Sequence, residues 1–191
     1  MANIGGTTGD DTITGTSTSD RINGGAGNDS LYGGGGADIL LGGTGYDFLD
    51  GGIGADYIVG GADNDVMMGR EGTDTFAFWF KTAGDGTVTS AEGTRPGDSV
   101  SITGSEGHDV ILDFDHRAGS ADKLDFNGLT SGQYDHLAAT GQLTYNHADY
   151  NGDGNTDMLI AWGGGSLLLS GITDLKIADL AALKSYILFD A

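Results

Sequence analysis

An aspartate recurs at every ninth residue between Gly6 and Ala77, and an apolar side chain follows each of these aspartates by two positions. Four consecutive nonapeptides, residues 24–59, match the pattern Gly-Gly-x-Gly-x-Asp-x-apolar-x without a mismatch. One nonapeptide is too short to bury its own apolar residue, so the copies have to stack on one another. The period therefore predicts a stacked parallel β-roll and disfavours a flexible Gly/Asp-rich linker.

Each nonapeptide divides into a short strand and a sharp turn. The three residues x-apolar-x form a strand that points one side chain inward and two outward. The six residues before them reverse the chain, and glycine supplies the positive φ angles that such a turn needs. Two nonapeptides complete one coil, so aspartates eighteen residues apart stack along one edge. One column is Asp11, Asp29, Asp47 and Asp65, and the other is Asp20, Asp38, Asp56 and Asp74.

These columns of carboxylates predict cation sites, because stacked negative charges repel one another unless a cation lies between them. The glycine turns offer free main-chain carbonyls beside the carboxylates, and such hard oxygen ligands suit Ca²⁺ better than Zn²⁺. One site between each pair of neighbours gives about 4–6 ions. The candidate ligands are the eight aspartates and the turn glycines Gly25, Gly27, Gly34, Gly36, Gly43, Gly45, Gly52 and Gly54.

Several nonapeptides outside residues 24–59 depart from the pattern, so the sites at the ends of the roll are less regular than those in the middle. The second copy, residues 15–23, lacks two of the three glycines. The seventh has Asp63 at the third glycine, and the eighth has Arg70 at the second. Irregular end coils are expected in a solenoid, because an end coil has only one neighbour.

The composition excludes several classes of function. The net charge is −20, with 28 acidic against 8 basic residues, so nucleic acid and anionic membrane surfaces are poor partners. Six calcium ions would leave a charge of about −8, an ordinary value for a soluble protein. The chain has no cysteine, which excludes disulfides and thiolate metal sites. The N-terminus has no features of a cleavable export signal, and no apolar run reaches the length of a membrane span.

The second half of the chain has the patterning of further strands. We expect the aromatic residues Phe76–Phe80 to belong to the core, where they could seal the end of the apolar stack, and residues 81–107 to form a long loop or hairpin. Residues 108–129 predict two strands around a turn at Arg117–Asp122, and residues 142–147 and 158–170 predict more. Residues 173–189 predict a short amphipathic helix before an apolar tail.

The outward strand positions of the later coils are apolar, which calls for a cover. We expect the β subdomain at residues 108–172 to pack on the roll at residues 1–80. Its cover is expected over Ile39, Leu41, Tyr57 and Val59. The alternative is a surface that binds a partner.

Residues 149–157 are a second calcium candidate. Oxygen-bearing side chains alternate there at Asp149, Asn151, Asp153, Asn155 and Asp157, and Gly154 follows the third of them. This resembles the first nine positions of an EF-hand loop, but the twelfth position is Ile160 instead of glutamate. The segment is therefore either a reduced calcium loop between two strands or an Asn/Asp/Gly turn without an ion.

No catalytic constellation is evident in the sequence. A His-Glu-x-x-His motif and a Gly-x-Ser-x-Gly elbow are both missing. The histidines at positions 108, 116, 136 and 147 are scattered, and we interpret them as surface residues. The many paired carboxylates follow from the repeat, so we expect a protein that is not an enzyme.

The order of motifs resembles one family of secreted proteins. The nonapeptides lead into Thr73–Phe76, followed by Gly107–Asp115, Asp122–Asp125, Asn151–Gly154 and Gly171–Leu175. This order resembles the C-terminal repeat-in-toxin (RTX) domain of serralysin-type metalloproteases, and it is similar to the R-modules of mannuronan C5-epimerases. The resemblance implies an all-β fold, in which a right-handed parallel β-roll precedes a C-terminal antiparallel β subdomain and a short helix. It also implies Ca²⁺ held by the sixth-position aspartates and by glycine carbonyls. It further implies an uncleaved secretion signal within residues 173–191, read by a type I (ABC) exporter.

The expected function is therefore that of a non-catalytic, extracellular calcium-binding domain. In a calcium-poor cytosol the carboxylates are uncompensated and the roll stays unfolded for export, whereas millimolar Ca²⁺ outside the cell folds it. The alternative is a carbohydrate- or cell-surface-binding module, for which Tyr32, Tyr46 and Trp162 are candidate contacts. An ice-binding solenoid is disfavoured, because the fifth positions of the nonapeptides form no regular Thr/Asn array.

Overall fold

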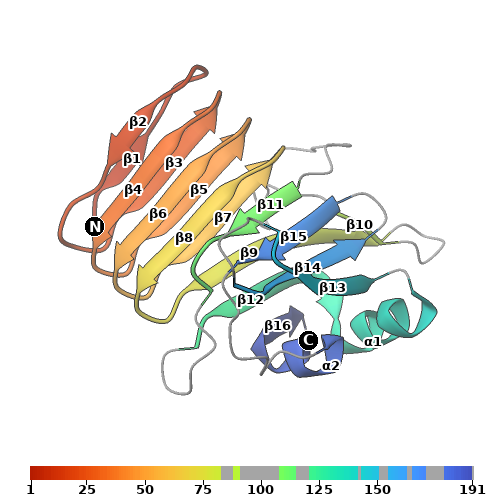
Figure 1. Ribbon diagram of the computed structural model, residues 1–191. Helices are drawn as coiled ribbons and strands as arrows, with labels where there is room; N and C mark the ends of the chain where they lie inside the picture. Colours follow the sequence, from red (N-terminus) through yellow and green to blue (C-terminus); the bar gives the residue numbers. More distant parts are fainter. Residues whose placement is uncertain are drawn as a thin grey trace.

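A computed structural model describes residues 1–82, 88–90, 108–114, 121–141, 143–150, 155–162, 165–170 and 179–190. The chain forms two sheets that lie face to face (Figure 1), and each has eight strands within these residues. The strand order is β1-β3-β5-β7-β9-β12-β16 in the first sheet, sheet A, where β10 also pairs with β9. It is β13-β14-β15-β11-β8-β6-β4-β2 in the second sheet, sheet B.

The nonapeptides wind alternately through the two sheets, as the period predicts. The strands of this part are β1 (Asn3–Gly5), β2 (Thr12–Thr14), β3 (Arg21–Ala26), β4 (Ser30–Gly35), β5 (Ile39–Thr44), β6 (Phe48–Ile53), β7 (Tyr57–Ala62), β8 (Val66–Glu71) and β9 (Thr75–Thr82). Strands two apart in the chain pair in parallel, and residues eighteen apart are partners, such as Leu31 with Leu49. Six-residue strands replace the expected three, because the first two glycines of the next nonapeptide continue the pairing, as Gly25 does with Gly43.

The apolar residue of each nonapeptide points between the sheets and stacks on its equivalent in the next coil. In sheet A these partners are Ile4, Ile22, Leu40, Ile58, Phe76, Leu124 and Ile187. Leu31, Leu40 and Leu49 are fully buried. The single-residue stack therefore becomes a continuous core, although one nonapeptide contributes only one side chain to it.

The roll does not end at Phe76, contrary to our expectation. Strand β11 (His108–Ile111) pairs in parallel with β8, and β12 (Lys123–Thr130) pairs in parallel with β9. The segment 108–129 thus supplies two strands, as predicted, but they lie in opposite sheets and form one further coil. Phe76 and Phe78 belong to the core, where their rings contact those of Phe114 and Phe126, so they continue the stack and do not seal it.

The C-terminal part completes both sheets. Strand β14 (Asp157–Trp162) pairs antiparallel with both β13 (Thr144–Ala148) and β15 (Gly165–Leu169), and β15 pairs in parallel with β11. The other elements are β10 (Val88–Ser90), α1 (Ser131–Thr140), α2 (Leu180–Leu183), η1 (Lys184–Tyr186) and β16 (Ile187–Asp190). No helix within the described residues has the length and hydrophobicity needed to cross a bilayer.

The helices differ from expectation. The helix predicted over 173–189 is limited to α2 and η1 in its described part, and residues 171–178 lie outside the described residues. The last residues form β16, which pairs in parallel with β12, and Ile187 is only 7% exposed. Helix α1 was not predicted, although Thr130 and Gln133 form a capping box at its start and Gly141 caps its end with φ 72°.

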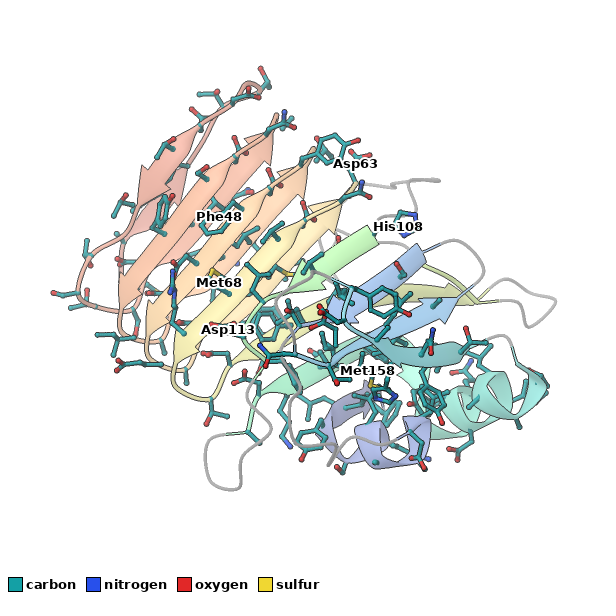
Figure 2. All side chains as sticks on the ribbon, viewed as in Figure 1. Phe48, Asp63, Met68, His108, Asp113 and Met158 are labelled. Carbon is teal, nitrogen blue, oxygen red and sulfur yellow. The ribbon has the colours of Figure 1, made fainter. Side chains whose placement is uncertain are left out.

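The outer faces of the sheets carry apolar side chains. On sheet A, Val59 and Ala77 are buried, with Leu41 and Tyr57 packed against them. The described part of the second half lengthens both sheets, and the Tyr57 hydroxyl donates to Asp125 at 3.2 Å. That the second half covers this face stays a prediction. On sheet B, Phe48 and Met68 lie half-buried on the outer face (Figure 2).

Candidate metal centre

The aspartates form two columns, one along each turn edge of the roll. In each column the main-chain amide of one aspartate donates to Oδ1 of the aspartate one coil later. Asp11 donates to Asp29, Asp29 to Asp47 and Asp47 to Asp65, at 2.8–2.9 Å. The second column repeats this from Asp20 through Asp38 and Asp56 to Asp74, at 2.7–2.9 Å. One carboxylate oxygen therefore fixes the register between coils and also fixes the direction of the other oxygen.

The other oxygen of the inner aspartates has no partner. Among the described residues, five buried side-chain oxygen or nitrogen atoms lack a hydrogen bond, and all five are aspartate Oδ2 atoms. They belong to Asp29, Asp38, Asp47, Asp56 and Asp65. These aspartates are at most 3% exposed. A buried carboxylate oxygen that has neither a donor nor a cation is strongly unfavourable, so five repeated cases in register indicate a missing positive ligand.

The first glycine of each inner nonapeptide faces this Oδ2 atom. A Cβ built on Gly42 would lie within 3.0 Å of both Oδ2 of Asp47 and the carbonyl oxygen of Gly60 on the next coil. Gly24 and Gly33 have the same surroundings, with Asp29 and Asp38 respectively. At these three turns, a carboxylate oxygen and a main-chain carbonyl thus approach the first glycine so closely that no larger residue fits without a shift.

The turn backbone of nonapeptides three to eight is left-handed at the second and fourth positions. Gly25 and Gly27 have φ of 111° and 105°, and the same positions are positive through Gly72. Asp63 (φ 80°) and Arg70 (φ 74°) adopt this conformation although they are not glycines. The Arg70 turn has additional support, because both oxygens of Asp113 accept main-chain amides, from Gly69 at 2.9 Å and from Arg70 at 2.8 Å. The Arg70 guanidinium also pairs with Asp50 at 2.8 Å.

Burial of the inner column aspartates makes their charged forms unfavourable and raises their pKa values. Burial raises the pKa of Asp47 and that of Asp56 to about 7, although each accepts a main-chain hydrogen bond that opposes the shift. Burial raises the pKa of Asp65 to about 9, and the neighbouring carboxylate of Asp109 adds to this shift. Burial also raises the pKa values of Asp29 and Asp38. The inner columns therefore favour a bound proton or a bound cation over free charge.

The donor set fits Ca²⁺. No three acidic or histidine side chains gather at one point within the described residues. The oxygens that meet at Gly24, Gly33 and Gly42 are an aspartate Oδ2 and a main-chain carbonyl oxygen. Calcium accepts six to eight such oxygens in a flexible geometry, whereas Zn²⁺ prefers nitrogen and sulfur ligands. All eight predicted aspartates lie in the two columns. The predicted turn glycines from Gly25 to Gly54 all have left-handed φ angles.

Sequence reasoning missed two aspartates that continue the columns. The main-chain amide of Asp65 donates to Oδ1 of Asp109, and that of Asp74 donates to Oδ1 of Asp122. Both are buried, and each is followed two residues later by a core residue, Ile111 or Leu124. The sequence pattern that could have identified Asp109 and Asp122 is therefore the same Asp-x-apolar spacing. It was missed because the residues between Ala77 and His108 interrupt the nine-residue period.

The second calcium candidate lies in the connection between β13 and β14. Asp157 is fully buried and accepts the main-chain amide of Tyr150 at 2.9 Å, whereas Asp149 and Asn155 are exposed. Asn151 and Asp153 lie outside the described residues. The flanking strands agree with a loop between two strands, and calcium binding there stays a prediction.

Two of the aromatic residues predicted as carbohydrate contacts, Tyr32 and Tyr46, lie in different parts of the roll. Tyr32 is 37% exposed on the outer face of sheet B, next to the ring of Phe48 at 5.9 Å. Tyr46 is 61% exposed in the turn between β5 and β6. The side chain of Trp162 lies outside the described residues. Of the histidines, His108 and His136 are exposed, as predicted for surface residues.

Comparison with known proteins identifies the repeat. The family described as RTX calcium-binding nonapeptide repeat (4 copies) matches residues 5–40, 14–49 and 41–76. Residues 5–76 are therefore similar to RTX calcium-binding nonapeptide repeats, and the fold and this match together support a calcium-binding β-roll domain. The curated proteins contain no match.

Two solved structures are similar to the chain. The AlgE6R3 subunit of the mannuronan C5-epimerase from Azotobacter vinelandii is 29% identical, with a TM-score of 0.44 over 96% of this chain and 80% of that one. The extracellular lipase LipA from Serratia marcescens is 15% identical, with a TM-score of 0.37 over 97% of this chain and 39% of that one.

Proposed function

We propose that this chain is an extracellular domain whose β-roll is held folded by Ca²⁺ at its turns. The observation that carries the proposal is the set of five buried Oδ2 atoms without a hydrogen-bond partner, each close to the first glycine of its nonapeptide, where a side chain would collide with it. The proposed ligands are Oδ2 of Asp29, Asp38, Asp47, Asp56 and Asp65, together with glycine carbonyls of the same turn and of the next coil.

The mechanism follows from the electrostatics of these columns. In the absence of a cation, folding buries carboxylates that have raised pKa values, and it also orders the glycines of the turns, whose conformational entropy opposes folding. Bound calcium supplies the compensating charge, so that binding free energy becomes folding free energy. The Asp-to-Asp hydrogen bonds position each Oδ2 atom before an ion arrives, and the core stack transmits order from coil to coil.

We further propose that the chain is exported unfolded by a type I (ABC) system and folds outside the cell. The support is the difference between cytosolic and extracellular calcium, which matches the requirement of the roll. Segment 173–191 as the secretion signal stays a prediction, and its described end is the core strand β16. Cells that express the chain should release it into the medium only with an ABC exporter of RTX proteins, and release without one would contradict the proposal.

Metal content tests the calcium sites directly. The protein is dialysed against Ca²⁺ or Mg²⁺, and bound metal is counted by inductively coupled plasma mass spectrometry. We expect several Ca²⁺ per chain and little Mg²⁺, since Mg²⁺ demands a small octahedral site and gives up its water reluctantly. A chain that binds no Ca²⁺ at millimolar concentration would remove the proposal.

A further inference from the structure

The first two turns of the roll differ from the six that follow. Their second positions are Thr7 and Thr16 in place of glycine. Neither threonine has a positive φ angle, and neither does Gly9 or Thr18 at the fourth position. The left-handed turn that recurs from Gly25 onward is therefore missing from nonapeptides one and two, although both have their sixth-position aspartate.

The threonines satisfy the oxygen that is left unpartnered elsewhere. Oδ2 of Asp11 accepts the main-chain amide of Thr7 at 2.6 Å and its hydroxyl at 2.8 Å. Oδ2 of Asp20 accepts the amide of Thr16 at 2.8 Å and its hydroxyl at 2.6 Å. Each carboxylate thus has two donors, where the five inner aspartates have none on the equivalent atom.

We propose that the N-terminal coil is a calcium-free cap, in which Thr7 and Thr16 take the place of the ion at Asp11 and Asp20. Two hydrogen-bond donors aimed at Oδ2 stabilise the carboxylate and also use the lone pairs that an ion would need. This inference rests on the proposed function, because it assigns which of the repeated turns bind Ca²⁺ and which do not.

The position of these turns explains why a cap is useful. They lie at the end of the roll, where strands β1 and β2 each have a neighbour on one side only and the Thr7 turn is exposed. The Thr7 turn has a coil on one side only, so its carboxylate is more open to solvent than those between two coils. A turn that satisfies its own carboxylate closes the roll at any calcium concentration, in the manner of the atypical end repeats of other solenoids.

Bound-calcium counts in four single variants test the cap. Asp11→Asn and Asp20→Asn should leave the number of Ca²⁺ ions per chain unchanged, whereas Asp29→Asn and Asp38→Asn should each lower it by one. The four changes remove the same charge from the same nonapeptide position, so each pair is the control for the other. Circular dichroism in saturating Ca²⁺ confirms that each variant is folded.

A gain-of-site variant tests the role of threonine and does not depend on the loss variants folding. Thr7→Gly converts residues 6–11 to Gly-Gly-x-Gly-x-Asp and should add one ion, whereas Thr7→Ser retains the hydroxyl and should add none. Loss of an ion in Asp11→Asn or Asp20→Asn, or an unchanged count in folded Thr7→Gly, would overturn the cap. If the wild-type protein binds several Ca²⁺ ions, a result that overturns the cap leaves the proposed function intact. A wild-type protein that binds no Ca²⁺ would instead contradict both the cap and the proposed function.

Discussion

The main-chain amide of Asp29 donates to Oδ1 of Asp47 at 2.8 Å, and Oδ2 of the same Asp47 carboxylate has no hydrogen-bond partner. One side chain therefore does two things. It sets the register between consecutive coils through one oxygen, and it presents the other to a space beside Gly42. Because this division repeats in both columns, a single substitution affects one site and leaves its neighbours in place.

Asp47→Asn should have opposite effects on stability with and without calcium. When the Ca²⁺ concentration is a hundredfold above the dissociation constant of the Asp47 site, loss of that site lowers the free energy of unfolding by about 2.7 kcal/mol. Without Ca²⁺ the change removes a buried, unpaired charge, so the variant should be no less stable than wild type. Urea denaturation in Ca²⁺ measures the first effect, and the β-signal of far-UV circular dichroism in chelator at pH 5.5 compares the variant with wild type for the second. Asp10→Asn is the control, since Asp10 is exposed and Asn retains the oxygen that accepts the Asn28 amide. Equal destabilisation in both conditions would contradict the assignment.

Gly42→Ala should block one site by occupying its space. The added methyl group would lie within 3.0 Å of Oδ2 of Asp47 and of the Gly60 carbonyl, so the site and the coil spacing have to adjust. We expect about 1–3 kcal/mol of destabilisation in Ca²⁺ and one ion fewer per chain. Gly35→Ala is the matched control, because the nearest atoms to its added Cβ are those of Ser17, at 3.6 Å or more. Thermal unfolding compares the two, and an equal effect of both would show that the close approach at Gly42 carries no special role.

At position 70, substitution by glycine should give a more stable protein than substitution by alanine. The Arg70 φ of 74° is unfavourable for any residue with a Cβ, so Arg70→Gly relieves backbone strain while it removes the ion pair with Asp50. Arg70→Ala keeps the strain and also loses the ion pair. The glycine variant should therefore be more stable than the alanine variant by about 1–2 kcal/mol. Chemical denaturation in saturating Ca²⁺ measures the difference. An alanine variant as stable as the glycine variant would be the contrary result.

Calcium-free protein should regain structure as the pH falls. The folded pKa values of Asp47 and Asp56 are about 7 and that of Asp65 is about 9, all above the ordinary 3.8. A raised pKa means that proton binding favours the folded state. This contribution is complete below about pH 4 and is lost as the pH rises through about 7 to 9. Metal-free protein should therefore show more β-structure at pH 5.5 than at pH 8.5, with sedimentation as a check for aggregation. A flat profile would contradict the burial of these carboxylates.

The same proton binding should weaken calcium binding. Protons and Ca²⁺ compete for Oδ2, so the apparent calcium affinity falls as the pH drops below about 7. Isothermal titration at pH 6 and pH 8 measures the change, and Ca²⁺ binding should release protons at the lower pH. Equal affinities at the two values would argue against ligands with raised pKa values.

The period predicted the columns, the core stack and the partition between sheets, since each follows from nine-residue spacing and needs no knowledge of tertiary contacts. The spacing did not separate Asp11 and Asp20 from the inner aspartates. That distinction depends on the donors of Thr7 and Thr16, which only the turn conformation shows. The coil at Asp109 and Asp122 was missed because the residues before it break the period. Helix α1 was missed because its signals are two short caps, and only Tyr134 and Leu137 on it are buried.

Far-UV circular dichroism during a calcium titration at pH 7.5 is the most direct measurement of the central claim. Protein freed of metal by chelation should give a coil spectrum, and Ca²⁺ should convert it to a β-spectrum in a transition that Mg²⁺ does not produce. A β-spectrum in excess chelator at this pH, unchanged when Ca²⁺ is added, would contradict the claim that calcium holds the roll folded.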